Sequence, residues 1–177
     1  MEAPFIPDDL QPIIDFHGHL CPGLVIGYRA AKAGMKQIHA MRSEDEELVT
    51  IVENNSCAVD AIQVMTGCTF GKGNFFFKDY GKHVYTLAIR PDGRGVRISL
   101  KNDAFREEDR EERIKHLLDL DEQQLFDIED VTIELPQQAQ IHNSVACHNC
   151  GEPVMETRIK EKNKEVYCIP CFNQKFQ

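Results

Sequence analysis

Four cysteines near the end of the sequence constrain its fold more than any other feature. They form two C-x2-C pairs separated by seventeen residues: Cys147, Cys150, Cys168 and Cys171. Two residues between thiolates let adjacent backbone turns aim both sulfurs at one cation, and four thiolates complete a tetrahedral zinc site. The sequence therefore predicts a structural zinc in this segment, with His148 as an exposed residue rather than a ligand.

The segment around these cysteines is predicted to be a treble-clef-like zinc finger. Gly151 follows the first pair, where a tight turn needs an unhindered backbone. Residues 157–167 are expected to form a hairpin that turns near Lys162 and Asn163. A short helix is expected after Cys168. Metal binding would supply the stability that so short a segment lacks.

A polar stretch at 136–146 divides the chain into two predicted domains. Residues 1–138 are expected to form an α+β core domain, and residues 143–177 the four-cysteine zinc finger. The finger has a net charge of +1, against −9 for the whole chain. An acidic chain with a nearly neutral finger argues against nucleic-acid binding, because phosphate backbones attract clustered Lys and Arg. The finger is more consistent with a structural role or with contact to a protein partner.

The remaining cysteines and the start of the chain favour a reducing compartment. Seven cysteines exclude a fully paired disulfide framework. The first residues have neither a basic region nor an apolar stretch, and no run approaches the ~18 apolar residues that cross a bilayer. We expect a cytoplasmic protein with no membrane partner.

Periodicity and turn residues predict mixed helices and strands in the core. Helices are expected at 22–37, at 57–65 after the cap 54–56, after a cap at Asp103, and near Asp121; strands are expected at 48–52, 83–89, 96–100 and 131–135. Strands and helices do not alternate strictly, so α+β is favoured over a doubly wound sheet. In helix 22–37, small residues on one face predict close backbone packing: Gly23, Gly27, Ala30 and Gly34.

A histidine and cysteine cluster precedes this helix. In an extended backbone His17, His19 and Cys21 would point to the same side. Cys21 and Cys57 each lie at a predicted helix start, where the helix dipole favours a thiolate. Asp60, one turn into the second helix, could accept a proton from a ligating histidine or act as a base.

These residues suit a second divalent metal, with zinc, iron, cobalt and nickel as the candidates and zinc favoured. His17, His19, Cys21 and Cys57 are the predicted ligands. Cys57, Cys21 and Asp60 are the predicted catalytic residues, whether the site is metal-dependent or a metal-free thiol site. The convergence of Cys57 with the others is a tertiary claim that spacing alone does not show.

A glycine-rich loop at 66–74 has one lysine and could hold an anion through backbone N–H groups. It does not match the P-loop pattern and it follows a helix rather than a strand, so a P-loop is rejected. A helix end and turn is the favoured interpretation, with Cys68 as a further candidate to line the core site.

Two blocks of the core resemble the E-subunit family of formylmethanofuran dehydrogenase. They are Phe16-His17-Gly18-His19-Leu20-Cys21-Pro22-Gly23, and 53–63 with its continuation through 66–74. The resemblance covers about residues 10–135, and the C-terminal part is similar to an auxiliary treble-clef finger of some members. It implies an α+β core, an intertwined homodimer, a cleft lined by the His/Cys motif and an association with one-carbon metabolism. The chain has no iron–sulfur or molybdopterin cysteine pattern, so this chain by itself is not expected to catalyse the family's redox step.

Two functions remain open. The first is a metal-binding protein with a His/Cys core site and a structural zinc finger, either an enzyme in its own right or a subunit of a molybdenum or tungsten formylmethanofuran dehydrogenase. The second is a non-catalytic accessory or adaptor subunit whose finger docks a partner protein.

Overall fold

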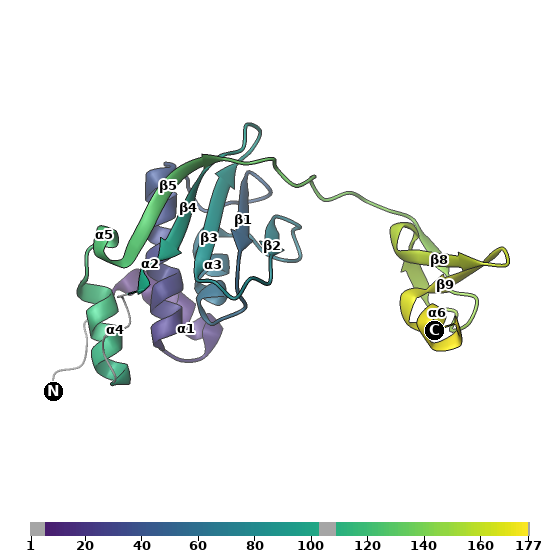
Figure 1. The fold of residues 1–177 in the computed structure, drawn as a ribbon, viewed down its shortest axis with the longest axis horizontal. Helices are drawn as coiled ribbons and strands as arrows, with labels where there is room; N and C mark the ends of the chain where they lie inside the picture. The colour runs from purple at the N-terminus through teal and green to yellow at the C-terminus, as the bar shows by residue number, and fades with distance from the viewer. Residues whose placement is uncertain (1–5, 103–108, 177) are drawn as a thin grey trace. The chain divides into compact units, whose positions relative to one another are not determined.

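The computed structural model describes residues 6–102 and 109–176. The chain folds into two compact units that divide between Gln138 and Ala139 (Figure 1). We name the unit before this division the core unit and the unit after it the finger unit.

A five-stranded mixed sheet forms one layer of the core unit, in the order β2-β1-β3-β4-β5. The strands are β1 (Leu48–Val52), β2 (Phe75–Phe77), β3 (Val84–Ile89), β4 (Arg94–Leu100) and β5 (Phe126–Thr132). β1 and β2 are parallel, and the other neighbouring pairs are antiparallel. With the helices, this mixed sheet confirms the predicted α+β class.

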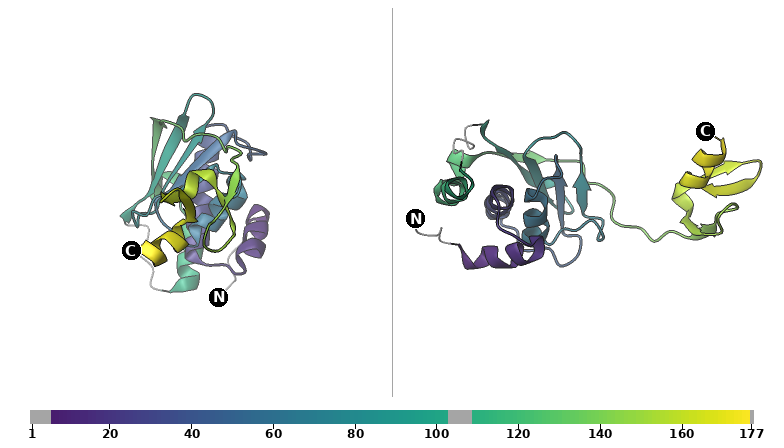
Figure 2. Two further views of the ribbon diagram at one scale, coloured as in Figure 1. Left: turned by 90° about the vertical axis from the view of Figure 1, so that its right-hand side faces the viewer. Right: turned by 90° about the horizontal axis from the view of Figure 1, so that it is seen from below.

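Helices α2 and α3 lie against one face of this sheet (Figure 2). The helical segments of the core unit are η1 (Asp8–Leu10), α1 (Gln11–His17), α2 (Pro22–Gln37), α3 (Ala58–Thr66), α4 (Arg110–Asp119) and α5 (Glu122–Leu125). In the register of β3 and β4, Tyr85 lies opposite Ile98 and Leu87 opposite Val96, so the four share a face. All four are fully buried and pack in one cluster with Ile26 of α2.

Most predicted elements of the core are present at the expected positions. α2 and β1 have the predicted bounds, and α3 ends at Gly67, whose φ is +70°. α5 follows Asp121, which forms a capping box with Gln124. The β3–β4 hairpin also forms, although β4 begins at Arg94 rather than at Val96.

Two local expectations need correction. The strand predicted at 131–135 is β5, which runs from Phe126 to Thr132, because β4 begins at Arg94 and Arg94 pairs with Thr132. Beyond that pair β4 offers no further strand residues for 133–135 to pair with. The side chain of Asn54 does not cap α3: it accepts from the backbone N–H (3.0 Å) and hydroxyl (2.7 Å) of Ser56 and so orders the preceding turn. Asp103 lies outside the described residues.

The small residues of α2 face two different neighbours. A Cβ on Gly27 would lie 2.1 Å from the carbonyl oxygen of Ala58, and one on Gly23 would lie 3.2 Å from Cβ of Cys57. A Cβ on Gly34 would instead meet Leu87 and Ile98 of the sheet. The predicted close packing is therefore present, and at its N-terminal end it brings the first turn of α3 onto α2.

The finger unit consists of two hairpins and a helix. Its elements are β6 (Ser144–Ala146), β7 (Pro153–Met155), η3 (Glu156–Arg158), β8 (Ile159–Lys162), β9 (Glu165–Cys168) and α6 (Ile169–Phe176). The β8–β9 turn places Asn163 and Lys164 at positive φ, close to the predicted turn. Tyr167 is buried against Phe172 and Phe176, which completes a very small apolar core.

Among the residues that the structure describes, none of the helices combines the length and apolar character that crossing a bilayer requires.

Candidate functional site

The four cysteines of the finger unit converge. The sulfurs of Cys147, Cys150, Cys168 and Cys171 all lie within 4.8 Å of one another. Tetrahedral zinc with Zn–S bonds of about 2.3 Å holds its sulfurs about 3.8 Å apart. The donor set therefore fits zinc with only small side-chain adjustments.

Backbone amides donate to the sulfurs of these cysteines and favour the thiolate form of Cys147. The N–H of Cys168 donates to the sulfur of Cys147 at 3.2 Å, and the N–H of Cys171 donates to that of Cys168 at 3.4 Å. Backbone N–H groups, first that of Cys150 and then that of Cys168, lower the pKa of the Cys147 thiol to about 6. Gly151 turns at φ +75° and donates to the carbonyl of Cys147, which closes the predicted knuckle.

His148 lies outside this ligand set. It is exposed, and its Nε2 atom lies 3.2 Å from a carboxylate oxygen of Glu165. The finger unit thus contains one site with four cysteine ligands, and the cofactor of this site is structural zinc.

A second cluster lies in the core unit. The donor atoms of His17, Cys21 and Cys57 lie within 4.8 Å of one another, and Nε2 of His17 is 3.9 Å from the sulfur of Cys21. The structure therefore brings together residues from the end of α1 and from the starts of α2 and α3. In tetrahedral zinc sites a nitrogen and a sulfur ligand are about 3.6 Å apart, so this donor set also fits the ion.

The route by which His17 reaches the cluster differs from the expected one. His17 is the last residue of α1 rather than part of an extended segment. Gly18 ends the helix at φ +97° and donates its N–H to the carbonyl of Ile14. This left-handed turn reverses the chain before Cys21, so the alternation expected for an extended backbone does not apply.

Asp60 fixes the orientation of His17. Its Oδ2 atom lies 2.7 Å from Nδ1 of His17, and the histidine side chain is 11% exposed. When Nδ1 carries the proton and donates to this carboxylate, the lone pair of Nε2 faces the two sulfurs. Metal-binding histidines in proteins commonly have such a carboxylate partner.

The position of Cys21 at a helix start predicts a favoured thiolate, but the environment of Cys21 in the structure favours the neutral thiol. Burial raises the pKa of the Cys21 thiol, although the N–H of Leu24 donates to its sulfur at 3.4 Å and favours the thiolate. The Cys57 thiol adds to this rise, and the Arg110 guanidinium opposes it. The desolvation of the sulfur thus outweighs the helix N-terminus.

Arg110 was not identified from the sequence. It begins α4 and donates to the carbonyl of Leu20 at 2.9 Å. Nothing in its local sequence indicates this contact, because ninety residues separate the two partners.

Two predicted site residues lie outside the three-residue cluster. His19 is exposed, and its ring centroid is 4.7 Å from that of His17. Its role as a ligand stays a prediction. Cys68 lies beyond the other end of α3, fully buried, and its thiol donates to the carbonyl of Leu48 at 3.2 Å.

The glycine-rich loop is a turn, in agreement with the favoured interpretation. The side chains of Thr69 and Asn74 accept backbone N–H groups inside the loop. Lys72 donates to the carbonyls of Ser43 and Glu44, each at 3.2 Å. These contacts occupy the lysine ammonium and two of the backbone N–H groups that the anion-binding alternative would use.

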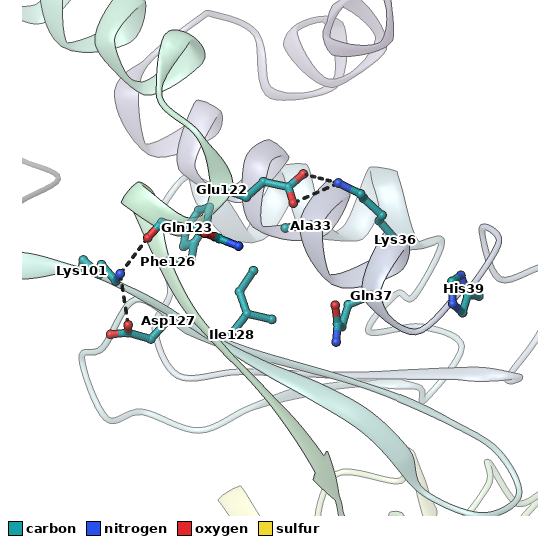
Figure 3. A pocket seen from close by; sticks show the side chains of 10 residues that line it. All are labelled: Ala33, Lys36, Gln37, His39, Lys101, Glu122, Gln123, Phe126, Asp127 and Ile128. Atoms are coloured by element: carbon teal, nitrogen blue, oxygen red, sulfur yellow. Dashed lines mark hydrogen bonds and ion pairs between the residues drawn. The ribbon is translucent and has the colours of Figure 1, made fainter.

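A polar cleft of about 690 Å³ lies between the end of α2, α5 and β5 (Figure 3). Its charged side chains pair with each other, as Lys36 does with Glu122 at 3.3 Å and Lys101 with Asp127 at 3.4 Å. None of the predicted site residues lines it. Lys36 and Cys21 lie at opposite ends of α2, about 22 Å apart along the helix axis, so the cleft and the His/Cys cluster are separate.

Comparison with known proteins gives consistent results for both units. The family model described as "FmdE, Molybdenum formylmethanofuran dehydrogenase operon" matches residues 16–133, and that of the "Prokaryotic dksA/traR C4-type zinc finger" matches residues 142–175. The sequence is 31% identical over 189 residues to a protein from Archaeoglobus fulgidus named "Probable S-adenosyl-L-methionine-binding protein". That alignment covers 89% of this chain and 50% of the relative, so the chain spans half the length of this curated relative.

A protein from Syntrophus aciditrophicus, described as a "tungsten formylmethanofuran dehydrogenase subunit e (fmde)-like protein", has the same fold in its crystal structure. The TM-score is 0.72 over 100% of both chains, at 21% sequence identity. The FmdE model matches more than half of the residues, including all three members of the core cluster. The chain therefore belongs to the FmdE family and carries a dksA/traR-type C4 zinc finger after its FmdE region.

Proposed function

We propose that the core unit binds a second divalent metal ion, with zinc as the first candidate, through His17, Cys21 and Cys57. The observation that carries the proposal is the convergence of one imidazole and two thiols within 4.8 Å, with a carboxylate behind the imidazole. If the two cysteines only filled space in the apolar core, they would not require a neighbouring histidine whose ring is oriented by an aspartate. Three protein ligands leave a fourth position open, which is typical of catalytic rather than structural zinc.

An ion in this position would supply Lewis-acid chemistry. The side chains of this chain would hold and orient it: Asp60 keeps the proton of His17 on Nδ1, and α2 and α3 fix the two sulfurs. His19 is exposed, with its ring centroid 4.7 Å from that of His17.

Elemental analysis of the full chain tests the proposal. We expect about two zinc ions per chain, one in the finger and one in the core. The double variant His17→Ala with Cys57→Ser should lose one of them and keep the other. Cys68→Ala is the matched control, because it removes a buried cysteine outside both clusters. Equal metal content in the double variant and the wild type would rule out the core site.

Replacing Asp60 with asparagine is expected to weaken metal binding in the core about 10- to 100-fold, because the imidazole loses its charged partner. Competition with a chromophoric chelator measures the affinity, and the finger zinc serves as an internal reference. Asp15→Asn is the control: Asp15 is an exposed carboxylate on α1 that accepts a hydrogen bond from Gln11. An unchanged core affinity in Asp60→Asn would show that the carboxylate does not orient the ligand.

A role in one-carbon chemistry belongs to the same proposal. It is supported by the family description, which names a formylmethanofuran dehydrogenase operon, and by a relative named for S-adenosyl-L-methionine, a one-carbon donor. Calorimetry with S-adenosyl-L-methionine, on metal-loaded wild type and on His17→Ala, tests whether a ligand of this class binds at the core site. Heat of binding that is equal in both proteins would place the ligand elsewhere.

The accessory role is the second candidate. Met155 is 45% exposed and Ile169 40% exposed on the finger unit, and apolar side chains of this kind suit contact with a protein partner. Partner recovery with the full chain should fall when both are replaced by serine while the zinc content stays unchanged. Identical partner sets for this variant and the wild type would count against docking through these side chains.

A further inference from the structure

The two cysteines of the core cluster face each other from the starts of two helices. Their sulfurs lie within 4.8 Å, and a Cβ placed on Gly23 would be 3.2 Å from Cβ of Cys57. The first turn of α2 thus packs its backbone against Cys57. The sulfurs of a disulfide are about 2.05 Å apart, so rotation of the two cysteine side chains must close the remaining gap.

We propose that Cys21 and Cys57 form a reversible disulfide, and that low-molecular-weight disulfides are the oxidants that this pair accepts. Cys68, the third cysteine of the core unit, does not compete for either sulfur. It lies beyond the other end of α3, and its thiol donates to the carbonyl of Leu48. The pair is therefore a defined redox site rather than two separate buried thiols.

The two sulfurs have different access to solvent, and this sets their order of reaction. Cys57 is half-buried, whereas Cys21 is 7% exposed and accepts the N–H of Leu24. An incoming disulfide can reach Cys57 first. Cys21 then lies behind it as the resolving thiol.

The exchange balances without a further reactant. The Cys57 thiolate attacks one sulfur of the external disulfide, forms a mixed disulfide, and releases one thiolate that takes up the proton lost by Cys57. The Cys21 thiolate then attacks the Cys57 sulfur and expels the second external thiolate, which takes up the proton lost by Cys21. The two protein thiols are oxidised by two electrons, and one external disulfide is reduced to two thiols.

Disulfide formation and metal binding exclude each other. The sulfurs are about 2.05 Å apart in a disulfide and about 3.8 Å apart around tetrahedral zinc. An oxidised pair also has no thiolate to offer as a ligand. Oxidation would therefore release the core metal, and bound metal would protect the two thiols from oxidation. This exclusion rests on the proposed function, whereas the pairing of the two thiols does not.

Peptide mapping of the full chain after incubation with oxidised glutathione tests the pairing. Cleavage before Asp45 and Asp60 places Cys21, Cys57 and Cys68 on separate peptides, so each cysteine of the core unit can be followed by itself. We expect one linked pair of peptides that contain Cys21 and Cys57, the loss of two alkylatable core thiols, and Cys68 still alkylatable after denaturation. Metal analysis of the same samples should show that the linked protein has lost the core ion and that metal-loaded protein resists linkage.

Single variants test the order of reaction. Cys21→Ser should accumulate the glutathione adduct on Cys57, because the resolving thiol is absent. Cys57→Ser should leave Cys21 unmodified, because it is buried. The proposal is overturned if no linked pair forms at any glutathione ratio in protein stripped of metal, or if both variants trap glutathione equally. If the pair becomes linked in a protein that binds no core metal, this inference stands and the proposed function is refuted. If the core binds metal but the pair never becomes linked, the proposed function stands and this inference is refuted.

Discussion

Replacing Cys168 with serine is expected to remove one zinc per chain and to unfold the finger unit, while the core unit keeps its own thermal transition. The finger unit has few buried side chains: Cys147, Cys168, Cys171 and Tyr167, with a few partly buried residues around them. Segments below about 40 residues rarely fold on apolar burial alone. Structural zinc in such units contributes on the order of 10 kcal/mol, so its loss outweighs what the aromatic cluster can supply.

Zinc analysis together with amide resonances of the full chain measures this effect. Resonances from Ser144 onward should collapse to random-coil positions, whereas those of the core should remain. His148→Ala is the control, because His148 lies between two ligands in sequence but is exposed and bonds Glu165 instead. It should retain its zinc, and a variant that lost zinc would reopen the possibility of a histidine ligand. A folded finger in Cys168→Ser would show that the apolar cluster is sufficient.

The ligand set, the second hairpin and the last helix of the finger could be predicted from its sequence because their constraints are local, whereas the hairpin of β6 and β7 was not predicted. The ligand spacing defines the site, the glycine after the first pair defines the knuckle, and the turn near Asn163 defines the hairpin. The core was predictable to a similar degree wherever local signals agreed, as for α2, where Pro22 begins a helix with a regular apolar face.

The three residues of the core cluster were among those named from the sequence, but the geometry that brings them together was not predicted. His17 lies at the end of a seven-residue helix, too short for a clear apolar period, and Gly18 then reverses the chain. For that reason His19, which an extended backbone would have aimed at the same point as His17 and Cys21, is exposed and lies outside the three-residue cluster although its ring is near that of His17. The pairing of Asp60 with His17 spans 43 residues, and such a contact depends on how α1 and α3 pack.

The end of β5 could not be predicted from the apolar pattern of its own segment. Alternating apolar residues continue from Val131 through Ile133 and Leu135, so the pattern alone favours a strand there. The structure ends β5 at Thr132, because Thr132 pairs with the first residue of β4. The end of a strand therefore depends on the length of the neighbouring strand, and the periodicity of one segment gives no information about that length.

Gly27→Ala is expected to destabilise the core unit by about 2 kcal/mol or more and to abolish the core metal site. Alanine in a helix interior gains about 1 kcal/mol over glycine. Here, however, the new Cβ would lie 2.1 Å from the oxygen, 2.6 Å from Cα and 2.7 Å from the carbonyl carbon of Ala58. These are backbone atoms, which cannot move aside by side-chain rotation, so α2 and α3 must separate. Because the clash is with backbone atoms, the cost lies at or above the upper end of the ~1–3 kcal/mol that overpacking typically costs, so it exceeds the gain in helix propensity by about 2 kcal/mol or more.

The consequence for the site follows from the sequence position of the clash. Ala58 is the first residue of α3 and directly follows Cys57, so a displaced α3 carries the Cys57 sulfur and Asp60 away from His17. Urea unfolding and metal analysis of the full chain should therefore change together. Gly34→Ala is the matched control in the same helix: its Cβ would meet the terminal side-chain atoms of Ile98 and Leu87, which can shift, and it lies far from Cys57. It should keep the core metal even if stability falls. Wild-type metal content in Gly27→Ala would mean that the close contact of α2 with α3 is not what holds the cluster together.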